Sequence, residues 1–337
     1  MFAVNNLPPA LQPRRIEIFR CSVLHDGFHF IPPSDHRDEA FPLGACAAIG
    51  SFDGVHVGHQ HVIESAIARA KLTNRPSSVI FFNPHPQTYF HPEATPFRLM
   101  EMAQQLRAFE ALGVDRAYIL SFNKHLSDLS AEQFAEAILQ DALGLSHVSA
   151  GFDFQFGKRG GGHASDLKTF GEQMGFTTDI LSQQSDAEGN KLSSSSVRDA
   201  LLAGDVLKAA HILGRPQAYL GEVVHGAKMG RTIDFPTLNL KLGDYQRPRY
   251  GIYVTQTVLG DGRVVNGVSN IGVRPTVGGD IELLETYLFD FAEEIYGQVV
   301  ETRLLDFIRP EAKFDSFEAL KLEIQNDARK ARDWFAR

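Results

Sequence analysis

The sequence predicts two domains: an α/β domain built on a parallel sheet with helices on both faces, then a small β-barrel or β-sandwich that ends in a helix. The chain has 337 residues, enough for two domains with cores of their own. Up to about residue 200, short apolar runs alternate with helical stretches, which is typical of βαβ units. Beyond about residue 215, short strand-like runs follow one another between Gly, Pro and Asn turns, which indicates a barrel or sandwich.

In the first domain, the expected strands are the apolar runs at 45–50, 78–82, 116–122, 147–152 and 177–181. Helical spacing covers 59–72, 98–112 and 131–143. Gly113 and Gly144 directly follow the second and third of these helices, where glycine is the usual stop. Ligands of such a sheet bind at the carboxyl ends of its strands, where we expect His56, Asn83 and Asp153 to lie.

The second domain is expected to contain strands over 221–226, 237–242, 250–259, 263–272, 283–291 and 299–308. The last helix should span 316–335, with Ser316 as its N-cap. A helical pair over 199–216, broken at Gly204 and stopped by Gly214 and Pro216, joins the two halves. We therefore place the first domain at 1–200, a helical linker at 201–215 and the second domain at 216–337.

The composition excludes several classes of protein. A hydrophobic content of 43% and a charged content of 22% are those of an ordinary soluble globular protein. The net charge of −8 argues against a nucleic-acid backbone as the main partner. Two cysteines, Cys21 and Cys46, cannot build a disulfide framework or a cysteine-based zinc site. No apolar stretch is long enough to span a bilayer and the start does not resemble a signal peptide, so we expect a cytoplasmic enzyme.

The segment GSFDGVHVGHQ, residues 50–60, links the first strand to the first helix. Its histidines, His56 and His59, are three apart and therefore share one side of the helix start, where free backbone N–H groups attract anions. Zinc is an alternative ligand, but no cysteine or carboxylate nearby repeats this spacing. Two surface histidines are another, although the three glycines of the segment favour close backbone approach. We expect the pair to bind an anion such as a nucleotide phosphate.

Two further segments of the first domain carry groups suited to phosphates. GFDFQFGKRGGG (151–162) has five residues rather than four between its first glycines and Arg159 after Lys158, which excludes a P-loop. Its backbone N–H groups could still cradle a phosphate, the alternative being a flexible basic loop. LSSSSVR (192–198) opens a helix that one serine must cap. The other hydroxyls and Arg198 would suit ATP phosphates or departing pyrophosphate.

The second domain carries two candidate features. In HGAKMGRTIDFPTLNL (225–240), Thr237 and Asn239 are two apart, so a strand would point both to one face. Two neutral oxygens suit Mg²⁺, and the alternative is a pair of polar residues on the wet face of a strand. Glu285 lies on an expected strand and is a candidate general base. Glutamates at 282, 293 and 294 lie nearby, so composition alone does not select Glu285.

These motifs together resemble those of bacterial bifunctional riboflavin kinase/FMN adenylyltransferases (FAD synthetases). GSFDGVHVGHQ is similar to the HxGH motif of nucleotidyltransferases in the longer form found in that family. FFNPHPQ (81–87) resembles its Pro-His-Pro segment, GFDFQFGKRGGG its flavin and nucleotide loop, LSSSSVR its serine-rich segment, and HGAKMGRTIDFPTLNL its riboflavin kinase signature. The match runs from about residue 44 onward. It implies a Rossmann-like nucleotidyltransferase domain followed by a small antiparallel β-barrel with a C-terminal helix.

The resemblance also assigns roles to residues of this chain. In the adenylyltransferase half it implies catalytic residues His56 and His59, nucleotide-binding residues Gly50, Phe52, Asp53, Gly58, Ser194, Ser195 and Arg198, and flavin-binding residues Asn83, His85, Asp153 and Phe154. In the kinase half it implies the catalytic base Glu285, nucleotide-binding residues Gly226, Lys228, Gly230 and Arg231, and metal ligands Thr237 and Asn239. The chain departs from the family pattern at Asn83, Ser195, Asp234 and Tyr287, where an acidic residue, threonine, glycine and histidine are usual.

The function implied is flavin cofactor synthesis in two steps. ATP phosphorylates riboflavin to FMN, and AMP is then transferred from ATP to FMN, giving FAD and pyrophosphate, with Mg²⁺ serving both steps. One alternative is a single-activity enzyme, which the departures at Asn83 and Asp234 keep open. Another is a flavin-binding sensor without catalysis, against which the intact catalytic residues argue. The expected partners are riboflavin, FMN and ATP, without nucleic acid or membrane, in a monomer or weak homo-oligomer.

Overall fold

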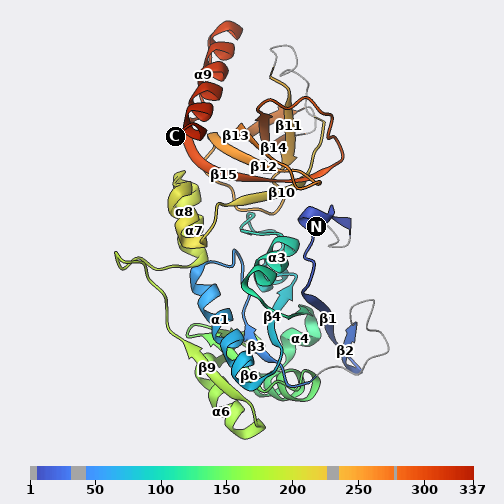
Figure 1. Cartoon of the computed structure of the whole chain (residues 1–337). Coiled ribbons are helices and arrows are strands. Elements are labelled where there is room, and N and C mark those ends of the chain that lie inside the picture. Colours follow the sequence, from blue (N-terminus) through green and yellow to red (C-terminus); the bar gives the residue numbers. More distant parts are fainter. Residues whose placement is uncertain (1–5, 32–42, 226–234, 277–278) are drawn as a thin grey trace. The chain divides into compact units, whose positions relative to one another are not determined.

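The computed structural model of the chain describes residues 6–31, 43–225, 235–276 and 279–337. Two compact units make up the chain (Figure 1). The sheet unit comprises Pro13–Thr95 and Gln105–Leu192. The barrel unit comprises Met1–Gln12, Pro96–Gln104 and Ser193–Arg337. Each unit is thus assembled from segments that are not contiguous in the sequence.

A seven-stranded sheet forms the centre of the sheet unit, in the order β2-β1-β5-β4-β3-β6-β9. All neighbouring strands are parallel except β1 and β2. The bounds are β1 Glu17–Leu24, β2 Gly27–Ile31, β3 Cys46–Ile49, β4 Ser77–Asn83, β5 Arg116–Ser121, β6 His147–Gly151 and β9 Thr177–Leu181. The predicted parallel sheet is therefore confirmed, with the unpredicted strand β2 added antiparallel at its edge.

The first two strands lie in a stretch to which we assigned no element. Phe19, Cys21 and Val23 alternate along β1 and all three are buried in the core of the sheet unit. This period of two was the available signal for the strand. Burial raises the pKa of the Cys21 thiol to about 12, so this cysteine is a protonated core residue.

Helices cover both faces of the sheet, as predicted. Ile80 of β4 packs in one core cluster with Phe134 and Leu167. The next residue, Phe81, points to the opposite face, and its ring lies 5.5 Å from that of Phe109. The helices are α1 Val57–Thr73, α2 Pro86–Phe90, α3 Met102–Leu112, α4 Lys124–Asp128, α5 Ala131–Phe134, the π-helix η3 Ala135–Ala142, the 3-10 turn η4 Lys158–Gly160 and α6 Ala164–Met174, with a short hairpin of β7 Gln155–Phe156 and β8 Gly162–His163.

The helix expected over 98–112 begins only at Met102. Arg98 instead forms an isolated parallel bridge with Tyr245 inside the barrel unit, which keeps its backbone extended. The helix start is fixed by Gln104, whose Oε1 accepts the Glu101 N–H at 2.9 Å. Tertiary pairing therefore overrides the helical pattern of the first four residues.

The barrel unit holds a six-stranded antiparallel sheet in the order β10-β15-β12-β13-β14-β11. An isolated antiparallel bridge, Val224 with Asn239, links β11 to the residues that follow β10 and nearly closes the barrel. The bounds are β10 Ala218–Glu222, β11 Thr237–Lys241, β12 Gly251–Val258, β13 Val264–Thr276, β14 Gly279–Leu288 and β15 Val299–Pro310. The barrel is therefore confirmed over the sandwich, and the strand expected at 221–226 lies three residues earlier.

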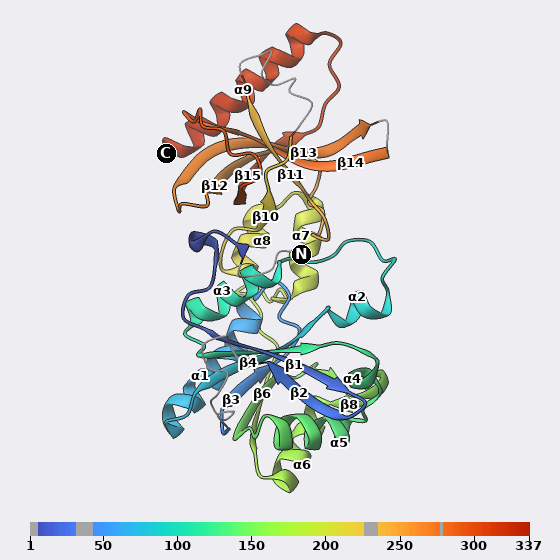
Figure 2. The same ribbon diagram turned by 90° about the vertical axis from the view of Figure 1, so that its right-hand side faces the viewer.

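Two helices immediately precede the barrel strands in the sequence and another follows them. The predicted helical pair is α7 Ser194–Ala203 and α8 Val206–Leu213, with Gly204 and Gly214 as left-handed caps. The long C-terminal helix α9, Phe317–Phe335, begins at its N-cap Ser316 and runs along the outside of the barrel (Figure 2). A short 3-10 turn, η2 Pro9–Leu11, precedes them all. Among the described residues, we find no helix with the length and apolar character needed to cross a membrane.

Candidate active sites

The carboxyl ends of β3, β4 and β6 meet at one edge of the sheet, because the three strands are parallel neighbours. Ile49 at the end of β3 pairs with Ile80 on one side and Ala150 on the other. The segments that carry His56, Asn83 and Asp153 therefore all leave the sheet at this edge, where an α/β sheet binds its ligands.

His56 and His59 form a stacked pair at the start of α1. His56 is the N-cap, and its Nδ1 accepts the His59 backbone N–H at 3.2 Å. The two rings lie 3.6 Å apart between centroids at an angle of 24°. The Phe52 ring meets His59 edge-on at 5.4 Å. The pair is thus held at the positive end of a seventeen-residue helix, where anions are stabilised.

Close packing explains the glycines of this loop. A Cβ on Gly58 would lie 2.9 Å from the Leu192 carbonyl oxygen and 3.1 Å from the His56 ring. A Cβ on Gly50 would lie 3.0 Å from the Phe52 ring. Any side chain at Gly58 would therefore displace His56. Asp53 is buried in the same loop.

Sequence reasoning missed a buried glutamine that holds this loop. Gln105 donates its side-chain N–H groups to the carbonyls of Ser51 and Phe52, at 3.2 and 3.0 Å. It is 2% exposed, although it lies on an amphipathic helix where a glutamine is expected to face solvent. Local pattern carried no signal for this contact.

The serine-rich segment behaves as the capping argument requires. Ser193 caps α7 by accepting the Ser196 N–H at 3.2 Å, which leaves Ser194 and Ser195 in the first helical turn. Arg198 donates Nε–H to the Phe97 carbonyl at 2.8 Å and lies over the Phe97 ring at 5.4 Å. These residues belong to the barrel unit.

The expected flavin residues differ in exposure. The Asn83 Oδ1 atom is buried and has no hydrogen-bond partner within the described part of the chain. His85 caps the short helix α2 by accepting the Gln87 N–H at 3.1 Å. Asp153 is exposed, and the Phe154 ring stacks on that of Phe156 at 5.5 Å.

A cavity of about 870 Å³ lies beside these residues in the sheet unit. Five phenylalanines line it, together with a basic and glycine-rich turn. The lining residues are Phe82, Pro86, Phe90, His91, Phe122, Leu126, Ser127, Asp128, Phe134, Gln155, Phe156, Gly157, Lys158, Arg159 and Gly160. Asn83 and His85 flank its wall in sequence, whereas Asp153 and Phe154 do not line it. Sequence reasoning missed most of the aromatic wall.

Two features shape the basic turn of this cavity. A Cβ on Gly157 would lie 2.6 Å from the Ala131 backbone nitrogen, so only glycine fits. Lys158 pairs with Asp128 at 3.1 Å, and hydrogen bonds from Lys124 and Lys158 lower the pKa of that carboxyl. The loop is therefore held by glycine packing and an ion pair.

In the barrel unit, strand register brings the predicted kinase residues together. Asn239 on β11 is the direct partner of Glu285 on β14, and Asn270 on β13 is the partner of Glu285 on its other side. Thr237 is the partner of Tyr287. Direct partners share a face, so all five side chains lie on one side of the sheet.

The donor set of this face fits Mg²⁺. Asn239 is 2% exposed, its Nδ2 donates to the Thr237 carbonyl at 3.4 Å, and its Oδ1 has no hydrogen-bond partner among the residues that the structure describes. A buried amide oxygen without a donor, two residues from a hydroxyl, matches the hard oxygen ligands that Mg²⁺ takes. Elsewhere in the described residues, no group of three or more His, Cys, Asp and Glu side chains is placed to hold a metal.

The neighbouring glutamates have other partners. Glu282 forms an ion pair with Arg247 and accepts from the Tyr250 hydroxyl, and the Arg247 guanidinium lowers the pKa of this carboxyl. Glu293 pairs with Arg263 at 2.6 Å. Glu282 is three residues from Glu285 on one strand, so the two side chains point to opposite faces.

A second cavity, of about 510 Å³, adjoins Thr237. It is lined by Val223, Pro236, Thr237, Leu238, Thr286, Leu288, Phe291, Ala292, Glu293, Glu294, Ile295 and Tyr296. Val223 and Pro236 flank the glycine-rich segment in sequence. The predicted nucleotide-binding residues Gly226, Lys228, Gly230 and Arg231, and Asp234, lie outside the described residues.

Comparisons with known proteins agree with the two units. The family model for FAD synthetase matches residues 38–196 and that for riboflavin kinase matches residues 213–335. A bifunctional riboflavin kinase/FMN adenylyltransferase of Pseudomonas fluorescens is 40% identical over 307 residues, which is 91% of this chain and 96% of that protein. One from Haemophilus influenzae is 37% identical over 301 residues, or 89% and 97% of the two chains. 

A solved structure gives the same result for the fold. The crystal structure described as a macrolide-efflux protein from Streptococcus pneumoniae is 32% identical, has a TM-score of 0.79, and covers 90% of this chain and 99% of its own. With both family models matched in order and the curated relatives matched over nearly their whole length, the chain belongs to the bifunctional riboflavin kinase/FMN adenylyltransferase family.

Proposed function

We propose that the two activities of the family are divided between the halves of this chain. Residues 216–337 would phosphorylate riboflavin to FMN, and residues 1–200 would transfer AMP from ATP to FMN. Two observations support this division: the stacked histidine pair at a helix N-terminus of the sheet unit, where an anion can bind, and the register that places Glu285, a candidate base, opposite Asn239, a candidate metal ligand, in the barrel unit.

In adenylyl transfer, an oxygen of the FMN phosphate attacks the α-phosphorus of ATP, and the bond to the bridging oxygen breaks to release pyrophosphate. His56 and His59 stabilise the charge that develops on the α-phosphoryl oxygens. The glycine-packed loop of Gly50, Phe52, Asp53 and Gly58 holds the pair in place. The resemblance to the family assigns Ser194, Ser195 and Arg198 to the binding of nucleotide phosphates.

We assign the cavity of about 870 Å³ to the flavin of FMN. Its volume lies in the range of small-molecule sites, and phenylalanine rings suit the flat isoalloxazine system. Lys158 and Arg159 at the glycine-rich turn offer charge to the FMN phosphate. Asn83 and His85 flank the wall in sequence, and the Asn83 Oδ1, which has no partner among the described residues, can accept from a flavin N–H.

In the kinase half, Glu285 takes the proton from the terminal ribityl hydroxyl of riboflavin. The hydroxyl oxygen then attacks the γ-phosphorus of ATP, and ADP leaves. Thr237 and Asn239 would hold Mg²⁺, which supplies charge neutralisation at the ATP phosphates. The cavity beside Thr237 would take the nucleoside of ATP. The resemblance to the family assigns Gly226, Lys228, Gly230 and Arg231 to nucleotide binding.

The protein is proposed to act in the cytoplasm, as a monomer or weak homo-oligomer, with riboflavin, FMN and ATP as its small-molecule partners. Product analysis on riboflavin plus ATP tests the function. FAD is expected; FMN alone would show that the adenylyltransferase half is inactive, and neither product would favour a flavin-binding sensor. Supplying FMN directly, with and without riboflavin, assigns each product to its step.

A further inference from the structure

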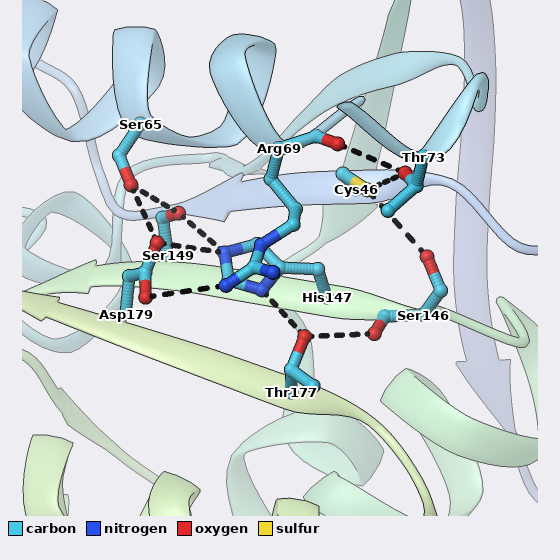
Figure 3. A network of polar contacts seen from close by, with 9 residues as sticks. All are labelled: Cys46, Ser65, Arg69, Thr73, Ser146, His147, Ser149, Thr177 and Asp179. Carbon is cyan, nitrogen blue, oxygen red and sulfur yellow. Dashed lines mark hydrogen bonds and ion pairs between the residues drawn. The ribbon is translucent and has the colours of Figure 1, made fainter. Parts of the chain in front are cut away.

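A buried polar network lies beneath α1, the helix whose first turn carries the histidine pair (Figure 3). Its centre is His147 on β6, which is 1% exposed. The ring Nδ1 lies 2.8 Å from the Thr177 hydroxyl on β9, and Nε2 lies 3.0 Å from the Ser149 hydroxyl. Nε2 is also 3.4 Å from Oδ2 of Asp179 on β9. His147 thus has a polar partner at each ring nitrogen.

Two side chains of α1 complete the network. Ser65 donates its hydroxyl to Asp179 Oδ2 at 3.0 Å, and its oxygen lies 3.2 Å from that of Ser149. The Arg69 guanidinium lies 3.9 Å from Asp179 Oδ1. Figure 3 shows Ser65 and Arg69 pointing from the helix toward the two strands. The network therefore joins α1, β6 and β9.

The proton arrangement follows from the partners. The Ser65 hydroxyl donates to Asp179 and the Ser149 hydroxyl donates to Ser65, so Ser149 accepts from the Nε2–H of His147. The Nδ1 atom then accepts from the Thr177 hydroxyl. Burial lowers the pKa of His147, opposed by Asp179 and reinforced by Arg69. The imidazole is therefore neutral at neutral pH, and Nε2 is the arm that points toward the hydroxyls under α1.

The hydrogen bonds of this network restrict the position of α1 in a way that apolar packing alone does not. The buried residues of α1 are Val62, Ile63, Ala66, Ile67 and Ala70. Their burial is non-directional and determines which side of the helix faces the sheet. Hydrogen bonds depend on distance and angle, so they also fix the position of the helix along its own axis. Ser65 is six residues beyond His59, about 9 Å along the axis, so a shift at Ser65 displaces the histidine pair.

We propose that His147 is a positioning residue for adenylyl transfer. Held by Thr177, it orients Ser149 and Asp179, which fix α1 through Ser65 and so fix the two histidines of its first turn. The proposal rests on the proposed role of that pair in the chemistry. His147 itself is buried and touches no substrate.

Two amide variants separate the arms of the ring. Asn places its amide near the Nδ1 position and Gln places its amide near Nε2. His147→Asn should keep the Thr177 contact, lose the arm toward α1, and lower kcat for FAD formation from FMN and ATP about tenfold, with the KM for ATP nearly unchanged. His147→Gln should restore most of that kcat. FMN formation by the same preparations should match wild type for both.

Ser65→Ala is the matched variant on the helix side, and it leaves the strand contacts of His147 in place. Alone it should also lower kcat for FAD formation about tenfold, and combined with His147→Asn it should cost little more, because both changes cut one connection. If His147→Asn does not fold, Ser65→Ala carries the same test. Equal losses in the Asn and Gln variants, additive losses in the double variant, or a rise in KM without loss of kcat would overturn the proposal.

A separate arm tests the proposed function itself. His59→Ala should abolish or greatly slow FAD formation. If FAD formation by His59→Ala stays near wild type, the proposed role of the histidine pair is wrong, whatever the His147 variants show. If His59→Ala is inactive while His147→Asn and Ser65→Ala are fully active, the proposed function stands and the positioning role of His147 is refuted.

Discussion

Replacing Gln104 by Ala should destabilise the barrel unit by about 3 kcal/mol. Gln104 is 4% exposed, and its amide N–H groups donate to Glu301 Oε2 at 3.1 Å and to the Ala218 carbonyl at 3.2 Å. Its Oε1 accepts from the Tyr245 hydroxyl and the Glu101 N–H. Glu301 is 5% exposed, so losing this donor leaves a buried carboxylate short of a partner. A charged hydrogen bond contributes about 1.5–3 kcal/mol and an orphaned buried hydroxyl costs about 1–3 kcal/mol.

The chain carries a reporter for this change. Its single tryptophan, Trp334, lies on α9 and packs against the barrel core cluster of Val254 and Val268. Urea denaturation followed by Trp334 fluorescence therefore reports unfolding of the barrel unit, and the midpoint should fall while the slope stays constant.

The neighbouring residue supplies a matched control. Gln105→Ala makes the same chemical change one position along the same helix, but its partners are Ser51 and Phe52 in the sheet unit. It should leave the Trp334 transition near wild type and lower FAD formation, because the loop before α1 loses two hydrogen bonds. A shift below about 1 kcal/mol for Gln104→Ala, or equal shifts for both variants, would refute the reasoning.

Three more outcomes are expected. His59→Ala should slow FAD formation about 10²–10³-fold and leave FMN formation near wild type; an equal loss in both would indicate a structural histidine. Glu285→Gln should lower kcat for FMN formation about 10²–10⁴-fold with little change in the KM for riboflavin. Glu282→Gln breaks the ion pair with Arg247 on the other face of the strand, so it should lower the urea midpoint instead. The reverse pattern would mean that Glu282, and not Glu285, is the base. Burial holds the pKa of His147 below its ordinary 6.5, so the unfolded chain binds more protons than the folded chain as pH falls through 6.5. The free energy of unfolding should therefore drop between about pH 7 and pH 5, and more steeply in wild type than in His147→Gln. Urea midpoints that change in parallel with pH in the two proteins would contradict this.

Local features of the fold could be predicted because local interactions determine them. The N-caps Ser193 and Ser316 and the glycine stops at Gly204 and Gly214 depend on residues within one helical turn. The assignment of segments to units could not be predicted in this way. Pro96–Gln104 belongs to the barrel unit through partners more than a hundred residues away, and no local pattern reports such contacts.

The candidate kinase site could be predicted further from the sequence than the cavity of the sheet unit, again because local patterns do not report long-range contacts. Strand alternation predicted that Thr237 and Asn239 share a face, but it could not choose Glu285 over Glu282. The register of β11 with β14 places Asn239 opposite Glu285, which supports the proposal of Glu285 as the base. The aromatic cavity of the sheet unit could not be predicted, because its wall is assembled from segments that are far apart in the sequence.

The departure at Asn83 acquires a physical meaning beside that cavity. Asp128 is the acidic residue among the lining side chains, and Lys124 and Lys158 already hydrogen-bond to it. Arg159 adds a further cation to the turn. An acidic residue at position 83 would add a second carboxylate at the cavity border, whereas the amide keeps the balance of charge positive. A positive balance favours a flavin that carries a phosphate over one that does not, which supports the proposal that this cavity takes FMN, the substrate of adenylyl transfer, rather than riboflavin.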